Sequence, residues 1–187
     1  MHHARIPSIL LTALALAACS NAGPGDHAAQ PSRALAELRV SSAALTPNAA
    51  IPAANACADD EHLGKSPALA WSAGPAGTVA YAVTAVDPDA HDFVHWAVVD
   101  VPKETTALPE GASPGGVLPA GARELKNDFG KPGYGGPCPP KGKPHHYVFR
   151  VWALDAPVPA SKADADFFRR LSEHALAAGT ITVTHQR

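Results

Sequence analysis

Polar side chains that could do chemistry gather where strand-like segments meet loops. Asp87 and Asp89 close one apolar segment, and His91 and His95 flank the start of the next, in the stretch DPDAHDFVHWAVVDVP. A further group lies at residues 135–147, with the sequence GGPCPPKGKPHHY. Carboxylates and imidazoles in such positions can hold a metal ion, transfer protons or bind a small charged molecule.

Common metal-binding and catalytic patterns do not fit these residues. The sequence contains neither HExxH nor CxxC, and His91 and His95 are four residues apart in a segment that indicates strand, not helix. It also has no GxSxG elbow on a strand-to-helix turn, which is where a nucleophilic serine of that type would lie. We therefore expect no metal ion and no cofactor. Hydrolysis that uses Asp87 with His95 or His145 as acid and base stays an alternative.

The elements that would position these residues are mainly strands. Apolar segments rich in β-branched and aromatic residues predict strands at 78–86, 93–101, 145–155 and 179–186, with weaker candidates at 38–42, 69–72 and 122–127. The apolar spacing at 163–178 predicts an amphipathic helix, with Gly179 placed as its C′ glycine. Residues 103–144 are rich in Pro and Gly and predict a long, ordered loop. This pattern favours an antiparallel β-sandwich with a C-terminal helix.

The N-terminal residues predict export. Arg5 precedes an apolar run at 9–18, which is shorter than the roughly 20 residues that span a bilayer. The run ends in LAAC, which is similar to the lipobox of bacterial lipoproteins and would make Cys19 the lipidated first residue. We expect a signal peptide at 1–18, a flexible tether at 19–37 and a folded domain at 38–187.

The residue after Cys19 bears on the membrane. Ser20 replaces the aspartate that commonly retains lipoproteins at the inner membrane, which favours an anchor in the outer membrane, on its periplasmic side. An ordinary signal peptide that happens to contain a cysteine is the alternative.

Charge and cysteine content narrow the function further. The formal net charge is −2 and the chain has no basic stripe, so we expect no nucleic-acid partner. If Cys19 is lipidated, Cys57 and Cys138 remain. An even number of cysteines in an exported protein indicates a disulfide, so we expect a bond between these two. Two separate buried thiols are the alternative.

Two long motifs indicate a family. The stretch DPDAHDFVHW resembles the DPDAP…HW signature of the phosphatidylethanolamine-binding protein family, whose bacterial members are also called Raf kinase inhibitor-like proteins of the YbhB/YbcL type. GGPCPPKGKPHHYVFRVWALD resembles the family's second signature. Shorter similarities include CADDEHLGKSPALAW, RELKNDFGKPGYGGP and EHALAAGTITVTHQR. The resemblance covers residues 38–187.

The resemblance implies a Greek-key β-sandwich with a small anion-binding pocket. Its ligand-binding residues would be Asp87, His95, Gly136, His145 and Tyr147, with Pro88 and Asp89 shaping the turn beside them. Imidazole N–H, phenol O–H and backbone N–H groups can all donate hydrogen bonds to a phosphate. His91 stands where the family usually has proline, so it either adds a third imidazole or is an exposed turn residue.

We therefore expect a noncatalytic lipoprotein of the cell envelope that binds a phosphate-like small anion or a phospholipid head group. Its partners would be that ligand, the membrane through the lipid anchor and, if the domain acts by protein binding, another protein. A protein-interaction or protease-inhibitor module is one alternative, and the hydrolase is the other.

Overall fold

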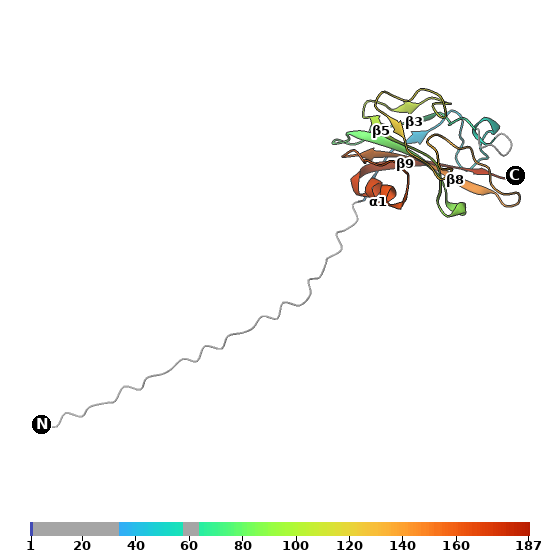
Figure 1. Ribbon diagram of the computed structural model, residues 1–187. Helices are drawn as coiled ribbons and strands as arrows, with labels where there is room; N and C mark the ends of the chain where they lie inside the picture. Colours follow the sequence, from blue (N-terminus) through green and yellow to red (C-terminus); the bar gives the residue numbers. More distant parts are fainter. Residues whose placement is uncertain (2–33, 58–63) are drawn as a thin grey trace. The chain divides into compact units, whose positions relative to one another are not determined.

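The computed structural model of the protein describes Met1, residues 34–57 and residues 64–187, and its described strands and helices belong to a unit at 34–187 (Figure 1). Residues 2–33 lie outside the described residues. They include the predicted signal peptide except for Met1, the predicted lipidation site Cys19 and most of the predicted tether. Within those described ranges no helix is long and apolar enough to cross a membrane.

The large sheet of the described domain has six strands in the order β1-β9-β8-β4-β5-β7. They are β1 (Ala36–Glu37), β4 (Ala80–Asp87), β5 (Phe93–Pro102), β7 (Arg123–Glu124), β8 (His145–Leu154) and β9 (Ala175–His185). Neighbours are antiparallel except for β1 and β9, which are parallel. β1 lies in the segment predicted as tether, so strand pairing begins before the predicted domain boundary at Leu38.

A second, three-stranded sheet covers one face of the large sheet. It contains β2 (Val40–Ser41), β3 (Leu69–Trp71) and β6 (Ala107–Leu108), in the order β2-β3-β6. Trp71 and Leu108 of this sheet share one buried core with Val83, Phe149 and Ile181 of the large sheet. The two sheets therefore form the predicted sandwich, and the mainly β fold class is confirmed.

The helix α1 (Ala165–His174) packs on the other face of the large sheet (Figure 1). Asp164 accepts a hydrogen bond from the backbone N–H of Phe167 and so caps the first turn of the helix. Phe167 and Leu171 bury their side chains against Trp152 and other residues of the sheet. Because the sheet is covered on both faces, its central strands are apolar at almost every position.

The predicted helix at 163–178 is wrong at its C-terminal end. The helix stops at His174, whose carbonyl oxygen accepts from the backbone N–H of Asp155 at 3.0 Å. Ala175 is already extended, with φ −71° and ψ 127°, and begins β9. Alanine is compatible with helix and strand alike, so pairing with β8 decides the conformation that local propensity predicted as helical.

Gly179 is therefore not a helix C′ residue, and its role is to permit a close approach of two backbones. It lies inside β9, opposite Val151 of β8. A Cβ atom at this position would collide with the carbonyl oxygen of Leu38 and with the side chain of Val40. Only glycine lets the N-terminal segment lie this close to β9.

Replacing Gly179 by alanine should lower the free energy of unfolding by about 1–3 kcal/mol, because the new methyl group overpacks the contact with Leu38. Urea denaturation measures this change. Thr180→Ala, at the next and exposed position, is the control and should cost about 1 kcal/mol or less. Equal stability of Gly179→Ala and the wild type would contradict the close-approach role.

Candidate functional site

The Asp87 carboxylate connects the end of β4 to the start of β8. Its Oδ1 accepts from the backbone N–H groups of Asp89 at 2.9 Å and Ala90 at 3.1 Å, which caps the short 3₁₀ helix η2 (Pro88–Ala90). Its Oδ2 lies 2.7 Å from Nδ1 of His145. The Asp87 side chain is 3% exposed and that of His145 is 18% exposed, so His145 lies at the mouth of this cluster.

Asp89 makes a second, exposed connection between η2 and β8. Its Oδ2 accepts from the backbone N–H of His146 at 2.7 Å and lies 2.8 Å from Nδ1 of the same residue. The backbone hydrogen bond from His146 is the main reason that the pKa of Asp89 is lowered. Asp87 therefore stabilises the turn at η2 from within, whereas Asp89 connects this turn to the start of β8.

A β-bulge directs His95 to the same face as Tyr147. In the pairing of β4 with β5, Ala85 faces Trp96 and Val86 faces Val94, so β5 contains one extra residue at His95. A bulge of this kind re-aims side chains that strict alternation would send to opposite faces. Trp96 and the neighbouring His95 ring can thus both meet the core between the sheets, where the rings of His95 and Tyr147 lie 5.2 Å apart.

The backbone of Gly135 holds the His95 ring in place. Nδ1 of His95 donates to the carbonyl oxygen of Gly135 at 2.8 Å, and the N–H of Gly135 donates to the carbonyl oxygen of His95 at 3.0 Å. The buried Asn127 amide donates to the carbonyl oxygens of His95 and Gly133. Phe129 packs edge-on against the imidazole, with ring centroids 5.3 Å apart.

Gly136, one of the predicted ligand-binding residues, has a packing role in the structure. A Cβ atom on Gly136 would lie 2.7 Å from the carbonyl carbon of Ala56 and 2.8 Å from the backbone nitrogen of Cys57. The N–H of Cys57 donates to the carbonyl oxygen of Pro137 at 3.0 Å. The structure therefore requires glycine here because the segment at 135–138 crosses the segment at 56–57 at very short range.

The same crossing carries the disulfide. Cys57 and Cys138 are bonded, with their Cα atoms 5.4 Å apart. The guanidinium group of Arg187 donates to Sγ of Cys138 at 2.9 Å, and the N–H of Gly142 donates to the carbonyl oxygen of Arg187. The loop segment at 135–138, which forms one wall of the cluster, is thus held by the disulfide to the segment at 56–57. It is also held by the hydrogen bond from the C-terminal Arg187 to Cys138.

Sequence reasoning missed Gly135 and Asn127 as residues that position His95. Asn127 lies in the RELKNDFG stretch, which resembles the family, but nothing in that stretch indicates that its side chain positions His95. Gly135 acts through its backbone carbonyl, which every residue has, so its type gives no signal. The bulge at His95 leaves no signal either, because the residues around it are apolar on both sides.

Tyr147 presents a buried hydroxyl to this cluster. Among the described residues the hydroxyl makes no hydrogen bond of standard geometry, although the Asp87 carboxylate lies close enough to interact with it. Burial, and then the negative charge of Asp87, raise the pKa of Tyr147, so the phenol keeps its proton at neutral pH and can donate a hydrogen bond. A buried donor without a well-formed hydrogen bond costs stability, which makes it the most unusual polar group of the cluster.

The two imidazoles of the cluster have defined tautomers. Nδ1 of His95 faces a carbonyl oxygen and Nδ1 of His145 faces a carboxylate, so both nitrogens carry a proton. In a neutral ring the lone pair is then on Nε2. Each ring can donate from Nε2 only after it takes up a second proton.

His185 pairs with His145 across β8 and β9. Desolvation, and then the charge of Arg187, lower the pKa of His185, so this imidazole is neutral at neutral pH. His91 does not add a third imidazole to the cluster. It is exposed, has a left-handed backbone with φ 57°, and lines a cavity on the opposite face of the sheet.

Comparison with known proteins gives consistent results. A family model described as "Phosphatidylethanolamine-binding protein" matches residues 41–186. The protein YbcL of Escherichia coli K12 is 45% identical over 130 residues, which are 65% of this chain and 71% of YbcL. A Mycobacterium tuberculosis H37Rv protein with the name "Putative lipoprotein LppC" is 35% identical over 130 residues, which are 68% of this chain and 60% of LppC.

A solved structure extends the similarity to the fold. The crystal structure of E. coli YbcL, described as a new member of the mammalian PEBP family, superposes with a TM-score of 0.75 at 37% identity. The match covers 81% of this chain and 99% of that structure.

Replacing Asp87 by asparagine should invert the tautomer of His145. The amide can still cap η2 with its oxygen, but its NH₂ group would then face Nδ1 of His145 and favour a proton on Nε2 instead. Long-range ¹H–¹⁵N NMR of the histidine side chains reports the tautomer. Asp155→Asn, which alters the exposed pair with His174, is the control and should leave the His145 signals unchanged. An unchanged tautomer in Asp87→Asn would show that the carboxylate does not orient this ring.

Proposed function

Because the chain belongs to the phosphatidylethanolamine-binding protein family, we propose that it is a noncatalytic binding protein whose site takes a small phosphate-like anion, free or as a phospholipid head group. The site is the cluster of Asp87, His95, His145 and Tyr147. Two strand ends and the loop wall at Gly135 position these side chains before any ligand arrives.

The buried hydroxyl of Tyr147, which makes no hydrogen bond of standard geometry with the described residues, carries this proposal. Buried polar groups in folded proteins nearly always have a hydrogen-bond partner, and an exception calls for an explanation. A ligand oxygen next to the hydroxyl would supply a well-placed acceptor. Asp87 already accepts three hydrogen bonds, with η2 and with His145, so its carboxylate serves mainly to orient.

The charge of the site also fits a ligand with both signs of charge. An anion meets the Tyr147 hydroxyl and, after protonation, the Nε2–H groups of the imidazoles. An ammonium group on the same ligand would compensate for the negative charges of Asp87 and Asp89. A phosphoethanolamine group combines both features, and inorganic phosphate has only the first.

We further propose that the protein acts in the cell envelope as a lipid-anchored domain. The LAAC stretch that ends at Cys19 and the relative named as a lipoprotein both support this location. The disulfide between Cys57 and Cys138 is also typical of an exported protein. Metabolic labelling with a radioactive fatty acid, with Cys19→Ser as the unlabelled control, tests the anchor.

Removal of the Tyr147 hydroxyl should lower the affinity for phosphoethanolamine without lowering the stability of the ligand-free protein. Tyr147→Phe should weaken the affinity for phosphoethanolamine by about tenfold, since one hydrogen bond to a charged group is lost. Stability without ligand should stay equal or rise, because a buried hydroxyl without a well-formed hydrogen bond disappears. Calorimetric titration and urea denaturation give the two quantities.

Tyr81→Phe is the matched control. The Tyr81 hydroxyl accepts from the backbone N–H of Gly74 at 2.7 Å, so its loss should cost stability by about 1 kcal/mol and leave affinity unchanged. Unchanged phosphoethanolamine affinity in Tyr147→Phe, or turnover of a phosphoester by the wild type, would contradict the proposal.

Anion affinity should fall as the pH rises. An imidazole that is protonated on Nδ1 must gain a second proton on Nε2 to donate to an anion, so binding through these rings takes up protons. The neighbouring Asp89 and Tyr147 keep their charge states through this range, since the pKa of Asp89 is lowered and that of Tyr147 is raised. His185 opposes the effect only at lower pH, because its own pKa is lowered.

Sulfate is the suitable probe because its charge is constant across this range. Its affinity, measured by calorimetry between about pH 5.5 and 8, should decrease by up to about tenfold per pH unit for each proton taken up. His95→Gln should flatten the profile, and His174→Gln, on the exposed helix α1, should leave it as in the wild type. A sulfate affinity independent of pH would show that the imidazoles do not donate to the anion.

A further inference from the structure

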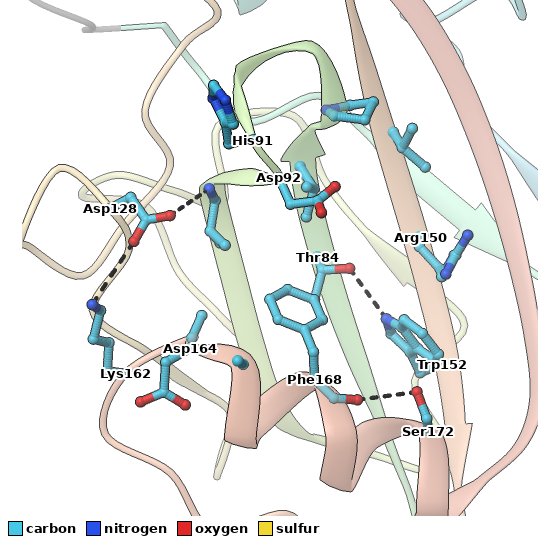
Figure 2. Close-up of a pocket in the computed structure, with 16 residues that line it drawn as sticks. Thr84, His91, Asp92, Asp128, Arg150, Trp152, Lys162, Asp164, Phe168 and Ser172 are labelled. Atoms are coloured by element: carbon cyan, nitrogen blue, oxygen red, sulfur yellow. Dashed lines mark hydrogen bonds and ion pairs between the residues drawn. The ribbon is translucent and has the colours of Figure 1, made fainter.

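A second cavity, of about 830 Å³, lies on the face of the large sheet that carries α1. Val86, Val94 and Val148 of the sheet line it and form what we call its apolar floor together with Trp152. Figure 2 shows Trp152 on the sheet and Phe168 on α1, both among the lining residues. Val148 follows Tyr147 in β8, so the two side chains point to opposite faces of the sheet. The cavity is therefore separate from the cluster around Asp87, and its size is typical of sites for small organic molecules.

Arg150 provides a positive charge at the edge of this apolar floor. Its guanidinium carbon lies 4.9 Å from the centre of the Trp152 ring, in a cation–π contact. The indole is itself fixed, because its N–H donates to Oγ1 of Thr84 at 3.1 Å. Within the described ranges Arg150 has no ion-pair partner, so its N–H groups can receive an anion from outside.

The acids of the cavity are mostly engaged. Asp128 accepts from the backbone N–H of Val94 at 2.8 Å and lies 3.9 Å from the ammonium of Lys162. Asp164 caps the N-terminus of α1 through the N–H of Phe167. The exception is Asp92, an exposed lining residue whose side chain makes no hydrogen bond or ion pair with the other described residues (Figure 2). Asp92 would oppose an anion, but its carboxylate is exposed, so water and salt screen its charge.

We propose that this cavity binds an amphiphilic organic anion, with its carboxylate on Arg150 and its apolar body on the floor and on Phe168. Two observations combine here: a half-buried cation that lies over an aromatic ring, and an apolar surface beside it that α1 leaves uncovered. A neutral amphiphile would use only the floor, and a cationic one would be repelled by Arg150.

Three probes that share a chain of about ten carbons test this assignment: decanoate, decanol and decyltrimethylammonium, titrated below any micelle concentration into the purified full chain. Binding is followed by calorimetry and by the fluorescence of the tryptophans. Decanoate should bind at least about tenfold more tightly than the other two, because it alone makes the charge-assisted bonds to Arg150. Equal affinity for the three probes, or tighter binding of the cation, would overturn the proposal.

Variants locate the site. Arg150→Gln should weaken decanoate binding by about tenfold or more, and Asp92→Asn should strengthen it. Lys103→Gln, which removes an exposed positive charge outside the cavity, is the matched control and should change nothing. Because loss of the stacked guanidinium could disturb Trp152, Val148→Trp is a second test that fills the cavity and keeps Arg150.

Decanoate binding that survives Val148→Trp at full strength, or that is unaffected by Arg150→Gln, would place the ligand elsewhere and refute the assignment. Tyr147→Phe should leave decanoate binding intact. Failure of this site is thereby distinguished from failure of the anion site on the other face.

Discussion

The buried carboxylate of Asp87 is the interaction on which the architecture of the site depends. It closes the turn after β4 through two backbone N–H groups and orients His145 through its other oxygen. A proline at the first position of η2 is compatible with this arrangement, because the missing N–H is not needed there. One side chain therefore couples the shape of the turn to the position of the neighbouring strand. Together, the turn and the strand set the position of the His145 imidazole.

The opposite side of the site depends on backbone chemistry. The bulge in β5 turns His95 toward Tyr147, and the carbonyl oxygen of Gly135 fixes the tautomer of the imidazole. Asn127 holds the two backbone segments together. The disulfide at Cys138 then joins this wall to the segment at 56–57. Rigid scaffolding of this kind lets a small site keep its geometry without a ligand.

The sequence was sufficient to predict the sandwich, its strongest strands and the residues that gather around the end of β4. Motif resemblance and apolar patterning both act over long segments, which makes them robust. The sequence was insufficient where tertiary contacts decide between helix and strand. Ala175 to Ala178 have helical propensity but pair as strand, and Gly179 serves a close backbone approach to Leu38 and not a helix cap. The roles of Gly135 and of the bulge at His95 could not be predicted, because backbone contacts are independent of residue type.

The pairing of distant segments at the cluster around Asp87 also has a consequence for how the chain folds. The bond between Asp87 and His145 joins residues 58 positions apart, and that between His95 and Gly135 joins residues 40 positions apart. Contacts of such long range are slow to form, since the loop between them must first be closed. The site is therefore assembled only after β8 has docked beside β4, and a chain released before that point would have no competent site. The intact cluster thus reports on completion of the fold, because folding intermediates in which β8 has not docked lack it.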